Sequence, residues 1–582
     1  MLLQIWNRSS VLVKSVPGKW ALTRPTSIFT NTQEQHREYS SKKKKSKSGR
    51  SSKRIENAIR DVGNAFAQSQ SKSSSASANW TKTKAYPFVY EPAQAPLTEV
   101  AHLAHDLDRV LFNPGVHFLQ DPRSKVYNFD PYLKNILPPS EFDFDALQPY
   151  ITSSKDENLR RLAIQHGKKF VGSTSSTSHL LSHMYFLTTA FKPINASVLS
   201  SSFANEPRGY TRSMKLPASV CLRLKDGVYA IDADKSFDVT DGVLIVLGKS
   251  MEKMLTLPPN EFANFHKENS WKIKDLKSTP EPYHYAKVED FLLRAQLDCQ
   301  DPRLPKQTFD LKTRAAMPIR LDKYNYLNNS IYQIKKRYGL FESFEREYFD
   351  MIRSAFLKYS IQVRIGNMDG VFVCYHNTAR VFGFQYISLD EMETRLFGNP
   401  TMGEQVFNMS IKLLGRILNT ATEKYPNQSL LVTVDTKETS QAMDVYVEAM
   451  NEEQGYSPSA EETVRALPVY KVKEDTKVSK WQINSYSMVN NRRVNGSFDV
   501  SSDGTDEWEF NYTLKEIKSS PSELIRQYQS VRKRQSEFYY TADDPNDKQR
   551  KKMGPQLTRL LEGLRQKQQE EEGAQVMYKP LR

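Results

Sequence analysis

The order of apolar and polar residues predicts a run of alternating helices and strands between residues 243 and 387. Residues 243–255 favour a helix, and short apolar runs bounded by turn residues follow them. The predicted elements are a helix at 243–255, strands at 284–288, 292–299 and 308–315, a long amphipathic helix with Phe341, Phe344, Tyr348, Ile352, Phe356 and Tyr359 on one face, and a hairpin of strands at 371–375 and 381–387. A helix, three strands, a helix and a strand make a small mixed α/β core.

Further elements are predicted on both sides of this core. Before it, five apolar residues recur at helical spacing and predict a segment that packs one face: Leu97, Val100, Leu103, Leu107 and Val110. Helices at 159–166 and 180–190, a hairpin at 220–231, helices from 390 to 422, a strand at 430–434 and a second hairpin between 483 and 517 complete the pattern. The charged tail carries a short apolar stripe, Leu557, Leu560, Leu561 and Leu564, which predicts a helix docked on the body or on a partner.

Shifts in composition divide the chain into six expected parts. These are a transit peptide at 1–39, a basic and serine-rich disordered arm at 40–85, an N-terminal α+β part of the body at 86–240, a core at 241–390, a C-terminal extension at 391–545 and a charged helical tail at 546–582. Ordered structure is expected to begin near Tyr86.

Composition excludes several classes of protein. The 582 residues are 38% hydrophobic, and no apolar run approaches the roughly 18 to 20 residues that a membrane helix needs. The sequence therefore predicts no integral membrane protein. Three distant cysteines, Cys221, Cys299 and Cys374, occur without a CxxC pair or a Cys/His cluster, which argues against a disulfide scaffold and a zinc finger.

The net charge of +15 is concentrated near the N-terminus. Residues 1–39 carry +3, residues 40–54 carry +8, and the remaining residues carry only +4. A nucleic-acid site in the body must therefore be a local groove and not a basic shell.

The first residues resemble an import signal. Residues 1–33 contain no acidic side chain and intersperse basic and hydroxyl residues with apolar ones, which is typical of a mitochondrial transit peptide. Arg37 precedes Ser40 in a pattern like that cut by matrix proteases, so Ser40 is the expected mature N-terminus. The lysine run at 42–54 then opens the mature chain and could contact RNA or the anionic matrix face of the inner membrane; charge does not decide which.

One strand carries an acid and an amine on the same face. Alternation along residues 308–315 places Thr308, Asp310, Lys312 and Arg314 on one side and Phe309, Leu311 and Thr313 on the other. Asp298 ends the preceding strand, and a turn could bring the two carboxylates together. Such a pair could hold Mg²⁺ or Mn²⁺ through oxygen ligands, while the lysine positions or deprotonates water and offsets phosphate charge.

Four other acid-x-Lys triplets compete with this site: 275–277, 435–437, 475–477 and 516–518. The first and third do not lie in convincing buried strands. Asp435 ends a strand, but its nearest upstream acid, Glu423, falls in or beside a helix. Glu516 is a stronger rival, because Asp506 precedes it in a plausible hairpin. The residues alone leave these sites competing.

Longer strings resemble a known family. Residues 295–299 (AQLDC) and 309–314 (FDLKTR) resemble the second and third motifs of the PD-(D/E)XK nuclease superfamily, close to its RecB-like members. Residues 168–178, 229–235, 248–255, 341–366 and 383–388 resemble a fungal mitochondrial RNA-processing family whose loss causes a petite respiratory defect. The matching strings run from about residue 95 to residue 450.

The resemblance implies a fold and a function. It implies an α/β protein with a PD-(D/E)XK, restriction-endonuclease-like core and large N- and C-terminal extensions. It also implies a mitochondrial 5′-to-3′ exoribonuclease acting in 5′-end processing and degradation of transcripts, attached peripherally to the matrix side of the inner membrane. Mitochondrial RNA and other RNA-degradation or transcription proteins are the partners it implies.

The family motifs assign roles residue by residue. Asp298 matches the second-motif acid, and Asp310 and Lys312 match the acid and lysine of the third. Glu252, on the helix before the first core strand, is taken from its order in the chain as the first-motif acid and a third metal ligand. The Gln-x-x-x-Tyr motif of RecB-like members is not cleanly present, and Arg346, Tyr348 and Arg353 stand in as candidates for phosphate or base contacts, with amphipathic helix surface and core as their alternative reading.

Two alternative functions stay open, and two further residue pairs need to be considered as sites. The chain could be a non-catalytic RNA-binding or assembly factor with a nuclease-like fold, or a mitochondrial DNA exonuclease. His179 and His183 are four residues apart, but without a following Glu or a third ligand they favour a structural role over a zinc site. Asp232 and Asp234 lack a following lysine and favour a supporting role.

Overall fold

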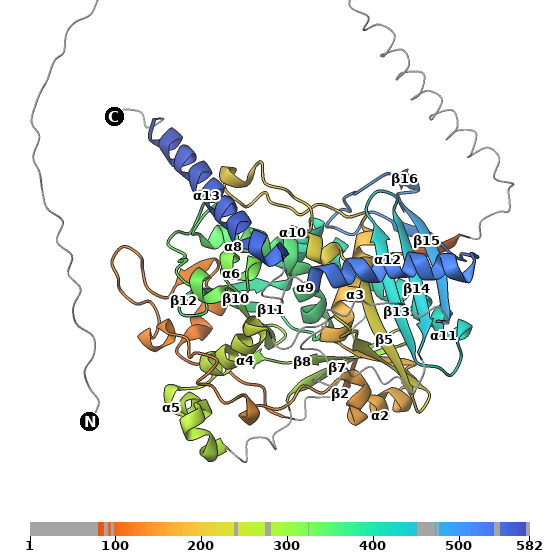
Figure 1. Ribbon diagram of the computed structural model, residues 1–582, viewed down its shortest axis with the longest axis horizontal. Coiled ribbons are helices and arrows are strands. Elements are labelled where there is room, and N and C mark those ends of the chain that lie inside the picture. The colour runs from red at the N-terminus through yellow and green to blue at the C-terminus, as the bar shows by residue number, and fades with distance from the viewer. Residues whose placement is uncertain are drawn as a thin grey trace, which may run out of the picture. The chain divides into compact units, whose positions relative to one another are not determined.

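Two sheets organise the chain (Figure 1). The computed structural model describes residues 80–577 except 87–90, 95–97, 238–241, 274–280, 324, 451–471, 473–475 and 540–547. The expected transit peptide and most of the basic arm lie outside the described residues. Strand β1 (Thr81–Lys84) is ordered within the range expected to be arm, so ordered structure begins before Tyr86.

Twelve strands of the described residues form the larger sheet, with β16 (Arg492–Val494) paired to β15 only. Its other members, in spatial order, are β1, β17 (Trp508–Glu516), β15 (Val478–Val489), β14 (Ala442–Ala449), β13 (Leu430–Lys437), β5 (Ala218–Lys225), β6 (Val228–Ala233), β4 (Phe170–Ser173), β8 (Phe291–Gln296), β7 (Tyr283–Val288) and β2 (Glu91–Gln94). The predicted hairpins at 220–231 and 483–517 are both present, as β5–β6 and β15–β17.

The smaller sheet carries the centre of the predicted core. Its order is β3 (Val116–Phe118), β12 (Val381–Ser388), β11 (Gly370–His376), β10 (Thr308–Ala315) and β9 (Cys299–Gln300). Strand β10 runs parallel to β11 and antiparallel to β9, with Asp310 opposite Val371 and Lys312 opposite Val373. The alternation predicted for residues 308–315 therefore lies in a central strand of this sheet.

Helices cover both sheets. The described α-helices are α2 (Glu157–Gln165), α3 (Thr174–Thr188), α4 (Val243–Thr256), α5 (Pro259–Phe262), α6 (Met317–Leu321), α7 (Tyr326–Asn329), α8 (Phe344–Ser354), α9 (Phe356–Ile365), α10 (Leu389–Phe397), α11 (Pro400–Lys424), α12 (Pro521–Tyr539) and α13 (Lys548–Met577). Helix α3 begins at Thr174, before the predicted start at 180, so the hydroxyl-rich residues 174–178 form its first turn and Ser173 caps it in a reciprocal capping box with Ser176. Helix α12 lies across β13, β14 and β15 (Figure 1).

The chain contains the nuclease core that the sequence predicts. Helix α4 precedes the antiparallel pair β7–β8, β8 continues through β9 into pairing with β10, and α8 and α9 form the crossover to the parallel strand β11. This order of a helix, three antiparallel strands, a helical crossover and a parallel strand is that of a PD-(D/E)XK core. The fold is α/β, with large segments before and after the core.

Two predicted core elements are interrupted. The strand predicted at 292–299 ends at Gln296 and resumes at Cys299, which leaves Leu297 and Asp298 between the two sheets. The single long helix predicted through residues 341–359 is wrong: α8 ends at Ser354 and α9 begins at Phe356, with Ala355 at φ −134°. Apolar periodicity continues across this break because both helices pack on the same buried cluster.

The helix expected from Leu97 to Val110 is also not formed as such. His105 and Asp106 adopt positive φ, and only a 3₁₀ helix at Leu107–Phe112 follows. Val100, Leu107 and Val110 are nevertheless buried. The apolar spacing therefore predicted correctly which side chains are covered, but the backbone there is not an α-helix.

The tail helix docks on the body. Leu564 of α13 is buried in the main core, and Gln568 Oε1 accepts a hydrogen bond from the backbone N–H of Phe341 at 2.8 Å. Lys567 lies 3.6 Å from Glu206. The sequence left a partner protein as an alternative, and these contacts favour the body. In the described part of the chain, no helix has the length and apolarity needed to cross a bilayer.

Candidate functional site

The fold brings Asp298, Asp310 and Lys312 together at the junction of the two sheets. Lys312 Nζ lies 2.5 Å from Asp310 Oδ2 and 3.9 Å from Asp298 Oδ2. Asp298 Oδ2 also accepts a hydrogen bond from the backbone N–H of Leu311 at 3.0 Å. The break between β8 and β9 therefore holds the Asp298 carboxylate directly against β10.

The alternation of β10 separates this polar group from the apolar core. Phe309 and Leu311 are buried in a cluster that includes Leu247 and Met251 of α4. On the other face, Lys312 Nζ lies 5.8 Å from the ring centroid of Tyr359 on α9. One face of the strand thus stabilises the fold while the other presents charge.

Burial of these charges shifts their pKa values. Asp310 is only 4% exposed, and burial raises its pKa well above the ordinary value; the nearby Asp298 adds to the rise, and Lys312 opposes it. For Lys312, burial acts to lower the pKa, but the carboxylates of Asp310 and Asp298 outweigh it and raise the pKa. Lys312 is therefore an ammonium ion at neutral pH.

Glu252 of α4 lies beside this group. Burial, followed by the charge of Asp298, raises the pKa of Glu252 to about 8. Glu281 contributes a further negative charge to the same place, while Lys253 lies 3.9 Å from Glu252. The position inferred for Glu252 from chain order is thus near the second-motif acid in space.

The donor set suits a hard divalent cation. Among the residues that the structure describes, no group of three His, Cys, Asp or Glu side chains is already arranged to hold a metal ion. However, Asp310 Oδ2 is buried and makes no hydrogen bond of good geometry, so Lys312 satisfies it by charge alone. Two neighbouring carboxylates that repel one another, one of which has a buried oxygen without a hydrogen-bond donor, fit Mg²⁺ or Mn²⁺, which prefer oxygen ligands.

The rival triplets do not form a comparable group. Asp435 is held by Lys437 and Arg534, and the neighbouring Asp444 by Lys480 at 3.2 Å. Glu516 pairs with Lys424 at 2.7 Å. Asp506 precedes the other end of the same strand, β17, and so does not meet Glu516. Residues 275 and 475 lie outside the described residues.

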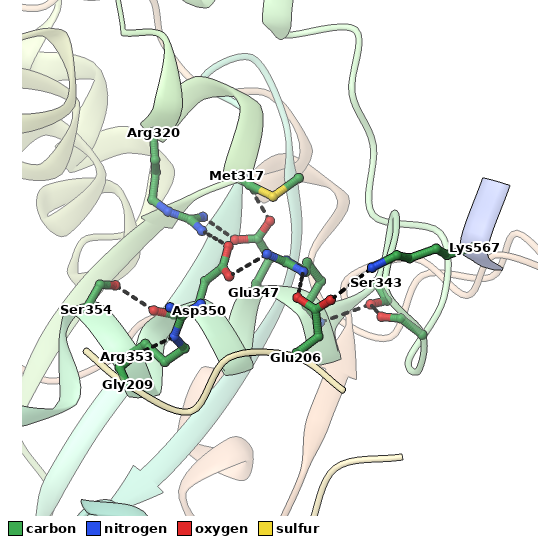
Figure 2. A network of polar contacts seen from close by, with 12 residues as sticks. Glu206, Gly209, Met317, Arg320, Ser343, Glu347, Asp350, Arg353, Ser354 and Lys567 are labelled. Atoms are coloured by element: carbon green, nitrogen blue, oxygen red, sulfur yellow. Dashed lines mark hydrogen bonds and ion pairs between the residues drawn. The ribbon is translucent and has the colours of Figure 1, made fainter. Parts of the chain in front are cut away.

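The candidates on α8 have other partners. Arg346 pairs with Glu206 and Asp350 at 3.2 and 3.0 Å, and Arg353 Nε donates to the carbonyl of Gly209 (Figure 2). The Tyr348 hydroxyl donates to Glu391. These contacts favour the structural interpretation of all three.

His183 and the aspartate pair have structural partners as well. His183 lies between Thr436 Oγ1 and the carbonyl of Leu216, at 3.0 and 2.8 Å, and burial lowers the pKa of His183 to about 4. Asp232 accepts hydrogen bonds from Ser154, and Asp234 pairs with Arg532 of α12 at 2.6 Å.

Sequence reasoning gave no role at the site to Glu281, Arg314 or Tyr359. It did place Arg314, by alternation along β10, on the same face as Asp310 and Lys312. Glu281 and Tyr359 come from segments whose approach to β10 no local pattern specifies.

Comparisons with known proteins agree on a family. Residues 150–419 match the model of the family described as "Mitochondrial protein Pet127". The Schizosaccharomyces pombe protein "mRNA degradation protein pet127, mitochondrial" is 40% identical over 365 residues, which cover 61% of this chain and 69% of that protein. A Saccharomyces cerevisiae protein, PET127, described as belonging to the mitochondrial translation system, is 43% identical over 312 residues, covering 50% of this chain but 37% of its own length.

Solved structures show a distant likeness. Candida albicans Rai1 in complex with pU5-Mn²⁺ aligns with 63% of this chain and 94% of its own, at 11% identity and a TM-score of 0.30. Scheffersomyces stipitis Rai1 aligns over the same shares with a TM-score of 0.29. The core described above rests on strand order in this chain and not on these alignments.

Proposed function

The chain belongs to the Pet127 family of mitochondrial proteins, and on this premise we propose that it is a metal-dependent ribonuclease of mitochondrial RNA degradation. The observation that carries the proposal is the convergence of Asp298, Asp310 and Lys312 where β8 gives way to β9 and β10. The name of the Schizosaccharomyces pombe relative supports RNA degradation as the setting.

The side chains of the site suit hydrolysis of a phosphodiester. Asp298 and Asp310 would hold a divalent cation, with Glu252 as a third ligand on the neighbouring helix. When bound, the cation would activate water and neutralise charge on the phosphate.

The protonation state of Lys312 determines which role it can have in catalysis. Because the nearby carboxylates raise its pKa, Lys312 carries a positive charge at neutral pH and does not act as a base from that state. Its ammonium group would instead donate hydrogen bonds to the attacking water and to the phosphate oxygens on which charge develops.

The finer assignments belong to the same proposal. We propose 5′-to-3′ direction, action in 5′-end processing of transcripts, a matrix location with peripheral attachment to the inner membrane, and contact with other RNA-degradation or transcription proteins. Residues 1–39 would act in import, and the basic residues 42–54 would attach the mature chain to RNA or to anionic lipid. The six-part division, with the nuclease core at 241–390, is kept as the organisation that serves this activity.

Degradation of matched RNA and DNA oligomers by the purified chain without residues 1–39 tests the proposal. Each oligomer would be labelled at its 3′ end and carry either a 5′-phosphate or a 5′-hydroxyl, with Mg²⁺, Mn²⁺ or EDTA present. We expect RNA to be shortened from the 5′ end with Mg²⁺ and left intact with EDTA. Preference for DNA would indicate the DNA exonuclease alternative, and cleavage in EDTA would contradict a metal-dependent site.

A second function is favoured by one finding. The Saccharomyces cerevisiae relative is described as part of the mitochondrial translation system, which fits a non-catalytic RNA-binding or assembly factor. If the chain binds RNA tightly but leaves every oligomer intact under all metal conditions, this function replaces the nuclease.

A further inference from the structure

Arg314 is a buried cation beside the proposed nuclease site whose charge is not matched. It lies on β10 on the same face as Asp310 and Lys312, and it is 7% exposed. Its Nε makes no hydrogen bond. In the part of the chain that the structure describes, no carboxylate lies within ion-pair distance of its guanidinium.

The contacts that Arg314 does make are weak. Its Nη2 lies 3.5 Å from Ser354 Oγ, at the limit of a hydrogen bond. That hydroxyl already donates to the backbone carbonyl of Asp350 at 2.6 Å (Figure 2). Arg314 therefore has donors to spare.

The acids near Arg314 are occupied by other cations. Figure 2 shows Arg320 bonded to both Glu347 and Asp350. Asp350 is shared with Arg346, which also holds Glu206. Burial lowers the pKa of Arg314 to about 10, and the charge of Arg320 adds to the lowering, while the charges of Glu347 and Asp350 partly oppose it. Arg314 is thus still protonated at neutral pH, in surroundings that disfavour its charge.

An unmatched buried cation destabilises the folded chain. The chemistry that would relieve this cost is an anion with several oxygens, since a guanidinium presents planar, forked donors that suit phosphate. Lys312, Ser354 and Tyr359 around it are only half-buried, so the surface beside the guanidinium is partly open to solvent.

The spacing of residues along β10 indicates which phosphate of the RNA Arg314 would bind. Two residues of a strand span about 7 Å, so Arg314 lies one step along the same face from Lys312. We propose that Arg314 binds a second phosphate of the RNA strand, next to the phosphate that is cleaved at Asp310 and Lys312. The inference rests on the proposed function of that site and adds a residue that positions the strand within it.

Binding of uncleaved RNA to the variant Arg314→Gln tests the proposal. Fluorescence anisotropy in EDTA would measure Kd for a short RNA with a 5′-phosphate, for the same RNA with a 5′-hydroxyl, and for one with a neutral methylphosphonate at its first internal linkage. We expect Arg314→Gln to weaken binding of the fully charged RNA by about tenfold or more. The Kd of Arg314→Lys, which keeps the positive charge but lacks the forked donors, should lie between the values for wild type and Arg314→Gln.

The modified RNAs identify the phosphate. If the variant no longer distinguishes the 5′-phosphate from the 5′-hydroxyl, the second phosphate is the terminal one. If Arg314→Gln binds the methylphosphonate RNA and the fully charged RNA with the same Kd, the second phosphate is internal. Either result supports the proposal. Equal Kd values for wild type and Arg314→Gln on all three RNAs would overturn it.

A matched arginine separates binding from folding. Arg364 of α9 is also largely covered, with 12% of its side chain exposed, but Glu393 holds it through two nitrogen atoms. We expect Arg364→Gln to lower Tm and leave Kd unchanged, whereas Arg314→Gln should keep or raise Tm, because it removes an unmatched charge. Since Kd is measured without metal, a wild type that binds RNA through Arg314 but never cleaves it would refute the nuclease and leave this inference standing.

Discussion

Two acid-x-Lys triplets on buried strands, 310–312 and 435–437, differ in how their charges are matched. Around Asp435, cations are plentiful: Lys437 and Arg534 both contact its carboxylate, and Lys480 holds the cross-strand neighbour Asp444. Although burial acts in the opposite sense, the hydrogen bonds from Arg534 and Lys437 lower the pKa of Asp435. This triplet anchors α12 to the sheet.

Around Asp310, negative charge is in excess. Asp298 and Asp310 share Lys312, and Glu252 stands beside them with its pKa raised to about 8. Removing one charge should stabilise this group, whereas removing one from the other group should weaken the fold. A triplet of the same composition is therefore structural where nearby charges balance it, and it is a candidate active site where the fold leaves those charges unbalanced.

Neutralising the acid of each triplet should give the largest difference between the two. Asp310→Asn keeps the shape of the side chain but removes the charge proposed to hold the cation, so we expect cleavage of RNA to fall by about 10⁴-fold. Asp435→Asn should leave turnover near wild type. Turnover would be measured on end-labelled RNA with Mg²⁺ in excess. The reverse pattern of losses would move the active site to the other triplet.

Replacing the lysines should give the next largest difference. Lys312→Ala removes the ammonium group that would stabilise charge on the phosphate, and we expect kcat to fall by about 10²- to 10³-fold. RNA affinity should largely persist, because many backbone contacts contribute to it. Lys437→Ala is the matched control and should retain kcat. Single-turnover rates and anisotropy would separate the two effects, and a change confined to Kd would contradict a role for Lys312 in chemistry.

Stability should respond in the opposite order. Asp435→Asn leaves Arg534 without its acid and Lys437 with only Asp444 at 3.7 Å, and it should lower the free energy of unfolding by about 2 kcal/mol. Asp310→Asn relieves repulsion and should leave the metal-free chain as stable as wild type or more so. Urea unfolding in EDTA checks both. Equal losses in the two variants would mean that the charges at 310 are matched in solution.

The last expected effect is a pH dependence of stability. The folded pKa of Glu252, about 8, exceeds its ordinary value, so the folded chain binds one more proton than the unfolded chain between about pH 4.5 and 8. Its contribution to stability is fully present below that window and is lost as pH rises through it. Glu252→Gln should flatten this part of the stability profile of the metal-free chain, measured as Tm against pH. An unchanged slope would show that Glu252 titrates normally.

Several features could be predicted from local pattern. The strand at 308–315 has the predicted bounds, and the predicted helix at 243–255 ends one residue later in the structure. Local pattern failed where the chain bends without changing its apolar spacing, as at Asp106 and at Ala355. At these places burial was predicted correctly, because apolar spacing reports which side chains are covered and not the backbone angles that cover them.

Local sequence pattern was enough to establish which side chains share a face. Alternation placed Asp310, Lys312 and Arg314 together on one side of a strand, and chain order gave the α/β core. Only the tertiary structure decided which charges meet. Arg534 neutralises Asp435 from 99 residues away, whereas the cation beside Asp310 is Lys312 of its own strand, and Nε of Arg314 has no hydrogen-bond partner in the described residues. Periodicity acts over a few residues, but charge balance in a buried site depends on segments brought together by folding, so the distinction between an anchor and a candidate active site exists only in three dimensions.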